Sequence, residues 1–321
     1  MSEPRISVVI PSRRRETRLA FALDALADQT LDSEQFEVIV VRSADSLTGL
    51  LSEAPAKLDL RFLTSQVAGA AAQRNLGWRE ARGALVAFTD DDCRPAPDWL
   101  ERMLDRGGAP REIVQGRTEP DPDEVHLLRG FARSVRVEDL DPWAPTCNIA
   151  YPREMLERLG GFDEAFPAAW GEDTDLAQRA IASGAHQRYA PDALVWHAVH
   201  PRVLASAISE SIERSNIHIA LARHPRLRGE LFCGLFTQRS HAFVLGVLFA
   251  LGIARRRPLL AALAAAPYVD EYVDRTVGKA HWTPATIARL LGVFIPRRVI
   301  LDSVELGAMA VSSVRHRTPV L

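Results

Sequence analysis

Residues 85–95 read Leu-Val-Ala-Phe-Thr-Asp-Asp-Asp-Cys-Arg-Pro. The apolar run predicts a short buried strand, and the Arg94-Pro95 pair predicts that this strand ends there. Because side chains alternate along an extended segment, we expect Asp90 and Asp92 to share one side. Two carboxylates on one side form a hard-oxygen site that suits Mg²⁺ or Mn²⁺. The alternative is an acidic turn in solvent, as isolated charge runs usually are.

The sequence before this stretch predicts an α/β unit. A β-branched run at 6–10 ends at Pro11 and leads into a basic loop at 12–16. Leucines at helical spacing then precede a second strand at 36–41, so the order is strand, helix, strand. Ligands of open α/β sheets gather beyond the carboxyl ends of the strands. We therefore expect the basic loop and the three acids to meet at one edge of the sheet.

A second acidic cluster opens a later helix. Glu172, Asp173 and Asp175 stand in its first turn, directly after Trp170-Gly171. Carboxylates there cap free amides and complement the helix dipole, which contributes roughly 0.3–1 kcal/mol each, so a structural role is the simplest interpretation. For His197 too, which follows an apolar run at 189–196, a structural role is the simplest interpretation.

The order and spacing of these motifs resemble a family 2 glycosyltransferase of the GT-A fold. The strand ending in Pro11, the helix with Arg74-Asn75-Leu76-Gly77 and the strand-borne Asp90-x-Asp92 resemble its nucleotide-sugar half. The Glu172-Asp173 block resembles its acceptor-side motif. The resemblance covers roughly residues 5–200. It implies a mixed α/β sheet flanked by helices at 1–200, with a donor half at 1–98 and an acceptor half at 99–200, followed by a helical region at 201–321.

The family's activity is metal-dependent, inverting transfer of a sugar from a nucleotide-sugar to an acceptor hydroxyl, with Mg²⁺ or Mn²⁺. The resemblance implies metal ligation by Asp90, Asp92 and His197, with His200 second to His197. It implies that Asp173, or failing that Glu172, is the general base. Contacts to the nucleotide-sugar are implied for Pro11, Arg13, Arg14, Arg74, Asn75, Asp90 and Asp91.

One departure concerns the nucleotide. Where the family has acids that contact base and ribose, this chain has Arg42-Ser43-Ala44, and Asp45 is the nearest acid. The sequence therefore does not predict which nucleotide is bound.

The region after residue 200 has a different composition. Residues 201–321 hold 16 Lys+Arg against 8 Asp+Glu, although the whole chain has a net charge of −2. Two apolar runs, 242–254 and 258–269, flank Arg255-Arg256-Arg257. The first is too short to span a bilayer, which takes about 20 residues. The pair predicts either a hairpin lying in the membrane interface or a buried helical hairpin.

We expect a cytoplasmic protein, or one held on the inner face of the cell membrane. Its acceptor would be a saccharide or lipid-linked saccharide of cell-envelope polysaccharide or glycolipid synthesis, and no nucleic acid partner is expected. The three cysteines are far apart and indicate neither a disulfide framework nor a zinc site. The first residues lack the pattern of a signal peptide.

Three other interpretations compete. A prenyl-diphosphate synthase or terpene cyclase also binds Mg²⁺ through aspartates, but on helices, whereas the acids here follow a short strand. A metal-dependent nucleotidyltransferase would also have an α/β fold. The third is a catalytically degenerate GT-A domain that binds nucleotide or acts as a membrane scaffold, for which Arg42 is the best support.

Overall fold

The computed structural model describes residues 3–44, 55, 57–167, 170–277 and 283–321. The chain forms two compact units, the first comprising residues 1–127 and 133–200 and the second residues 128–132 and 201–321. Asp45 lies outside the described residues. The separate donor and acceptor halves expected within residues 1–200 stay a prediction.

In the described part of the first unit, the strands form one mixed sheet in the order β3-β2-β1-β4-β7-β6-β8-β5. Their bounds are β1 Ile6–Ser12, β2 Phe36–Ser43, β3 Leu60–Ser65, β4 Leu85–Thr89, β5 Cys93–Pro95, β6 Glu112–Pro120, β7 Asn148–Pro152 and β8 His186–His197. β3, β2, β1 and β4 are parallel neighbours, and β7 runs antiparallel to β4 and β6. This mixed sheet confirms the predicted α/β class.

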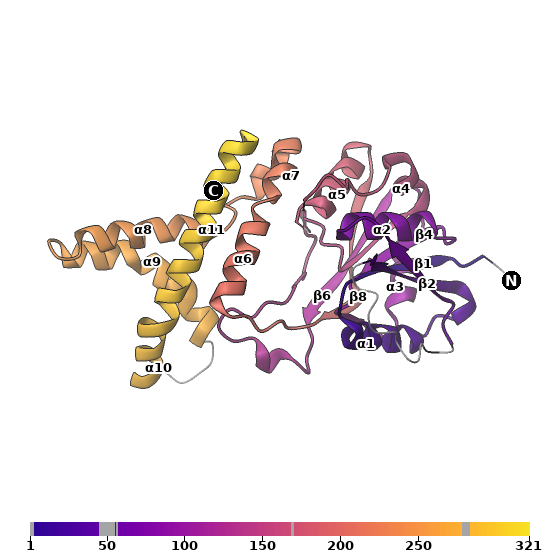
Figure 1. Ribbon diagram of the computed structural model, residues 1–321, viewed down its shortest axis with the longest axis horizontal. Helices are drawn as coiled ribbons and strands as arrows, with labels where there is room; N and C mark the ends of the chain where they lie inside the picture. Colours follow the sequence, from indigo (N-terminus) through magenta and orange to yellow (C-terminus); the bar gives the residue numbers. More distant parts are fainter. Residues whose placement is uncertain (1–2, 45–54, 56, 168–169, 278–282) are drawn as a thin grey trace. The chain divides into compact units, whose positions relative to one another are not determined.

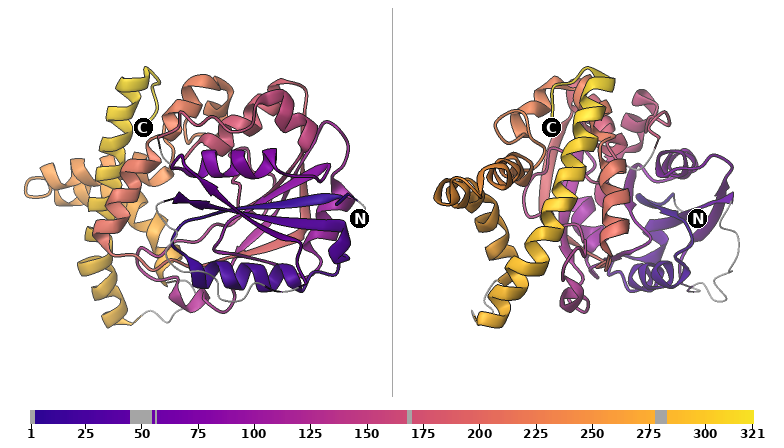
Figure 2. Two further views of the ribbon diagram at one scale, coloured as in Figure 1. Left: turned by 45° about the vertical axis from the view of Figure 1, so that its right-hand side comes forward. Right: turned by 60° about the vertical axis from the view of Figure 1, so that its left-hand side comes forward.

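Helices cover both faces of the sheet (Figures 1 and 2). The helices of this unit are α1 Glu16–Ala27, α2 Ala70–Arg79, α3 Trp99–Arg106, α4 Arg153–Leu159 and α5 Glu172–Ala182. Alternate residues of each strand point to opposite faces. Val8 and Val40 therefore pack with α1 and α3, whereas Val9 and Val41 pack with α2, α4 and α5. The near-continuous apolar strands of the sequence follow from this burial on both faces.

The segment after β4 departs from the prediction. The apolar strand, β4, already ends at Thr89, and Arg94-Pro95 end a separate strand, β5, which pairs antiparallel with β8. β5 is an edge strand of the sheet, and an edge tolerates a proline that cannot donate to a neighbour. Residues 90–92 are not extended either: the Cys93 amide donates to the Asp90 carbonyl oxygen at 3.1 Å and closes a tight turn.

Two pairings place the ends of strands together. Parallel β1, β2 and β4 end at the same edge of the sheet, as the sequence predicted. At the far side, Cys93 of β5 is the register partner of His197, the last residue of β8. The Ala198 amide continues this pairing to the Asp92 carbonyl oxygen at 2.9 Å. The acids after β4 and the histidine after the apolar run are therefore neighbours.

The second unit is helical. Its helices are α6 Leu204–Arg214, α7 Ile217–Arg223, α8 Arg239–Ile253, α9 Pro258–Val277, α10 Pro284–Arg289 and α11 Ile295–His316. α8 and α9 form a hairpin, and Val244, Tyr268, Tyr272 and Leu306 form a core at its base. Within the described residues, we find no helix long and apolar enough to cross a membrane.

Two neighbouring glycines after α4 allow a matched test of packing. Gly160 and Gly161 both have positive φ, +75° and +74°. A Cβ on Gly160 would meet no atom within 4 Å, whereas one on Gly161 would lie 2.4 Å from both Asn75 Oδ1 and Trp78 Nε1. We predict that Gly160→Ala lowers the free energy of unfolding by about 1–2 kcal/mol through backbone strain alone. Gly161→Ala should cost about 1–3 kcal/mol more through the clash.

Urea denaturation of the two variants measures the difference. Equal costs would mean that the Asn75 and Trp78 side chains move aside without loss.

Candidate active site

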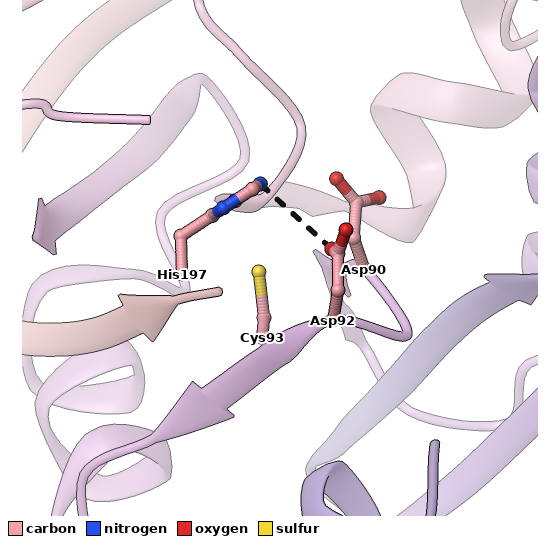
Figure 3. A group of neighbouring side chains, drawn as sticks. All are labelled: Asp90, Asp92, Cys93 and His197. Carbon is pink, nitrogen blue, oxygen red and sulfur yellow. Dashed lines mark ion pairs between the residues drawn. The ribbon is translucent and has the colours of Figure 1, made fainter. Parts of the chain in front are cut away.

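The turn after β4 gathers four potential metal-binding side chains. Ligand atoms of Asp90, Asp92, Cys93 and His197 all lie within 4.8 Å of one another (Figure 3). Asp90 is partly exposed, and the others are buried. The turn brings Asp90 and Asp92 together, which the sequence argument expected from an extended strand. The pairing of β5 with β8 supplies His197.

The ring of His197 is oriented by its backbone. Its Nδ1 lies 2.8 Å from the carbonyl oxygen of Ala198. A carbonyl can only accept, so Nδ1 carries the proton, and in the neutral ring the lone pair is on Nε2. Nε2 is 3.7 Å from Asp92 Oδ1. A histidine that donates through one nitrogen to a carbonyl and presents the other to a carboxylate has the arrangement of a metal ligand.

Asp92 is the most strongly paired carboxylate of this group. Arg15 Nη1 lies 2.5 Å and His200 Nε2 2.8 Å from its Oδ2. Burial opposes its charge, but the His200 hydrogen bond and the charge of Arg15 outweigh burial and hold the pKa of Asp92 well below its ordinary value. Arg15 was missed by the sequence reasoning, which chose Arg13 and Arg14 from the same loop. Only the basic character of the loop pointed to it.

Asp91 faces the loop after β1. Its Oδ2 accepts from the Ser12 hydroxyl at 2.9 Å and from the Arg13 amide at 3.2 Å. Arg15 reaches its Oδ1 at 3.1 Å. Burial raises the pKa of Asp91 to about 6, against the opposing charge of Arg15. Asp91 therefore fastens the end of β1 to the acidic turn.

Arg74 connects the acidic turn to α5. From the middle of α2, its Nη2 donates to Asp90 at 2.9 Å and its Nη1 to Glu172 at 3.0 Å. The Arg74 side chain is only 6% exposed. Burial and repulsion by Asp173 raise the pKa of Glu172 to about 7 in spite of Arg74. One guanidinium thus faces three carboxylates, too many for all of them to be ionised at little cost.

Glu172 and Asp173 differ in accessibility. α5 begins directly after Gly171, whose φ is +99°, so that the first turn starts at Glu172. Glu172 is buried against Arg74, whereas Asp173 is partly exposed. Asp173 Oδ1 accepts from the Thr174 amide at 2.8 Å, and desolvation by the surrounding protein raises the pKa of Asp173 above its ordinary value. Of the two, Asp173 is better placed to meet an acceptor.

The remaining predicted contact residues lie in different surroundings. Pro11 is buried in β1, and Arg13 and Arg14 are exposed in the loop beyond it. Asn75 is 1% exposed: its amide nitrogen donates to the Phe162 carbonyl and to Glu164, and its oxygen accepts from Trp78 and the Phe162 amide. All four hydrogen-bonding positions of Asn75 are used within the protein. Asn75 consequently fixes the 161–164 turn, and its predicted contact to the nucleotide-sugar stays a prediction.

The donor set fits a hard divalent cation. Asp92 Oδ1 is buried without a hydrogen-bond partner and lies within the ligand group. The two carboxylates suit Mg²⁺ or Mn²⁺, which prefer oxygen ligands, and His197 adds one nitrogen donor. Cys93 does not suit them, because burial raises the pKa of its thiol and keeps it protonated.

Comparison with known proteins gives consistent results. Residues 7–160 match the family model described as glycosyl transferase family 2. The chain is 28% identical over 268 residues to the validoxylamine A glucosyltransferase of Streptomyces hygroscopicus subsp. limoneus, an alignment that covers 71% of this chain and 59% of that protein. It is 26% identical over 210 residues to glycosyltransferase AglE of Haloferax volcanii, covering 62% and 68%. The chain thus spans about six tenths of the length of the validoxylamine A glucosyltransferases.

Solved structures share the fold. The mannosyltransferase PcManGT from Pyrobaculum calidifontis, in complex with GDP-Man and Mn²⁺, superposes with a TM-score of 0.59 at 22% identity, covering 98% of this chain and 88% of that one. S. aureus TarS 1–349 in complex with UDP-GlcNAc gives 0.50 at 15% identity, covering 98% and 92%. Likeness at these identities establishes the GT-A fold.

The buried position of Arg74 generates a stability prediction. Arg74→Met should lower the free energy of unfolding by about 3–5 kcal/mol, because it leaves buried carboxylates without their cation. Those carboxylates can bind protons instead, with folded-state pKa values above the unfolded ones. Their ionisation therefore costs stability as the pH rises, so the loss should be larger at pH 8 than at pH 5.5.

Arg79 on the same helix provides the control. It is 52% exposed and lies 3.8 Å from Glu164, so Arg79→Met should change the free energy of unfolding by less than about 1 kcal/mol. Chemical denaturation at both pH values measures each loss. Equal losses for the two variants would show that Arg74 does not hold the site together.

Proposed function

The chain belongs to the family 2 glycosyltransferases, and from this we propose that it transfers a sugar from a nucleotide-sugar to an acceptor hydroxyl with inversion at the anomeric carbon. The observation that carries the proposal is the placement of Arg74. It contacts Asp90 of the candidate metal group and Glu172, the neighbour of the candidate base. The residues implied for donor chemistry and those implied for acceptor chemistry therefore lie on two sides of the same guanidinium.

We assign the diphosphate of the donor to the edge near β1 and β4. Asp90, Asp92 and His197 would hold Mg²⁺ or Mn²⁺, which offsets the negative charge of a leaving diphosphate when bound. Arg15 already lies against Asp91 and Asp92, within the same group of charges. A guanidinium binds phosphate oxygens in the same bidentate way as carboxylates, so Arg15 is the first candidate for a protein contact to the diphosphate. Arg13 and Arg14 are further candidates.

We assign the general base to Asp173. Its carboxylate would take the proton of the acceptor hydroxyl as that oxygen attacks the anomeric carbon. The bond between the anomeric carbon and the diphosphate oxygen breaks in the same step, and the nucleoside diphosphate leaves. Support comes from the partial exposure of Asp173, in contrast to the buried Glu172. One displacement inverts the anomeric configuration.

The acceptor that we propose is a saccharide or lipid-linked saccharide of the cell envelope. Its support is the excess of arginine in residues 201–321, which suits an anionic or lipid-borne substrate. We propose no particular nucleotide, because Arg42 occupies the place of the family's acid. The guanidinium carbon of Arg42 lies 4.9 Å from the centre of the Phe62 ring.

Metal-dependent donor cleavage tests the metal group. The purified chain, incubated with a panel of nucleotide-sugars, should release nucleoside diphosphate with Mn²⁺ and not with EDTA. Asp92→Asn should abolish both this release and Mn²⁺ binding followed by electron paramagnetic resonance, because it removes a charged ligand.

Asp123→Asn is the matched control, because Asp123 is 77% exposed on a surface ion pair with Arg94 and outside the ligand group. It should keep both properties. Mn²⁺ binding without release from any donor, with candidate acceptors present, would favour a nucleotide-binding scaffold. Unchanged Mn²⁺ binding in Asp92→Asn would remove the assignment of the metal group.

The pH dependence of turnover tests the base. Asp173→Asn should lower the release rate by about 10²–10⁴-fold with donor binding retained. The wild-type rate should fall as the pH drops through the raised pKa values of the Glu172–Asp173 pair, near 7 for Glu172, because the base is then protonated. Glu172→Gln should move this acid limb to lower pH, because it removes the repulsion that favours protonation of Asp173.

The same two variants also test whether Glu172, and not Asp173, is the general base. If Glu172→Gln abolishes turnover and Asp173→Asn only moves the limb, Glu172 is the base.

A further inference from the structure

The end of the α8–α9 hairpin exposes a stripe of apolar side chains. Leu259 and Leu263 of α9 are 83% and 70% exposed. The stripe consists of Leu245, Leu248 and Phe249 on α8, at helical spacings of three and four, and of Leu259, Leu260 and Leu263 on α9. The two helices run side by side (Figures 1 and 2). Exposed large apolar side chains that recur along two neighbouring helices often mark an interaction site, so the stripe calls for a partner.

The hairpin is anchored at its other end. The hydroxyls of Tyr268 and Tyr272 both donate to Asp302 of α11, at 2.8 and 2.6 Å. Closer to the tip, a Cβ on Gly246 would lie 2.4 Å from the Ala264 carbonyl oxygen, so the helices are packed as closely as glycine allows. The apolar stripe is therefore presented by two helices that are fixed to the rest of their unit.

The charges beside the stripe are of one sign. Residues 242–269 contain three charged side chains, Arg255, Arg256 and Arg257, and no acid. All three arginines are exposed in the turn between α8 and α9. A second copy of the chain, docked symmetrically on this tip, would bring two such triplets together, which is unfavourable. A bilayer with anionic headgroups offers hydrocarbon for the stripe and phosphates for the arginines.

We propose that the tip of the α8–α9 hairpin docks on a membrane that contains anionic phospholipids. The hairpin lies in the interface, with the apolar stripe in the outer acyl region and the arginines extended to the phosphates. This docking goes beyond the proposed glycosyl transfer: donor cleavage needs only residues of the first unit, so the two can fail separately.

Vesicle co-sedimentation of the full chain tests the proposal. The wild type should bind vesicles of phosphatidylcholine mixed with phosphatidylglycerol more tightly than vesicles of phosphatidylcholine alone, and added salt should remove the difference. The triple variant R255Q/R256Q/R257Q should lower the partition coefficient on mixed vesicles by on the order of 100-fold. The variant L248S/F249S/L259S/L263S should lower it on both kinds of vesicle by at least about tenfold.

The control is V311S/V314S, which changes two exposed valines of α11 outside the hairpin and should bind as the wild type does. Nucleoside diphosphate release without vesicles should be unchanged in all three variants. The proposal is overturned if the wild type does not bind mixed vesicles, or if the hairpin variants bind them as tightly as the control does. It is also overturned if size-exclusion chromatography shows an oligomer that the apolar variant dissociates, because the stripe is then covered by a second copy.

Discussion

The site depends on one buried guanidinium. Arg74 stands in the middle of α2 and contacts the acidic turn after β4 through Asp90 and the start of α5 through Glu172. These segments are far apart in sequence, and each carries carboxylates that would repel the other. A cation between them changes this repulsion into an attraction. The neighbouring Gln73 donates to the Ser12 and Val41 carbonyl oxygens, so this part of α2 is also attached to the carboxyl ends of β1 and β2.

The same balance of charges governs the other side of the acidic turn. Asp91 and Asp92 share Arg15, and Asp92 has His200 in addition. Cations of the protein thus stabilise the ionised form of Asp92, whereas burial favours the protonated form of Asp91. A divalent cation at Oδ1, the oxygen of Asp92 without a hydrogen-bond partner, would share this carboxylate with Arg15 and His200, which contact Oδ2. In the proposed reaction Arg15 then exchanges a carboxylate for a phosphate, which keeps its charge compensated throughout.

The sequence predicted the parts of this arrangement that are local. Apolar runs located β1, β2 and β4, helical spacing located α1, and the acidic first turn located α5, because each depends on a few consecutive residues. Pairing across the chain could not be predicted in this way. The register of β5 with β8, which sets His197 beside Asp92, and the contact of Arg15 with Asp92 join residues more than 70 positions apart. The hydrogen bonds of Asn75 could not be predicted for the same reason, since its partners lie in the distant 161–164 turn.

Arg42 belongs to a group of arginines near the carboxyl ends of β1 and β2, whereas the acids follow β4 and open α5. At the end of β2 the chain has this cation stacked on Phe62, and the loop after β1 has three arginines. The acids lie beyond them, after β4 and at the start of α5. A nucleotide-sugar carries its negative charge in the diphosphate, between a neutral base and a neutral sugar. In the proposed reaction the diphosphate is drawn to the boundary where Arg15 meets Asp92, which leaves the base toward β2 and the sugar toward α5. An acid at the end of β2 contributes to recognition of base and ribose in the family but not to this orientation. On this proposal the replacement of that acid by Arg42 leaves turnover intact, and the family's pattern does not predict which nucleotide is bound.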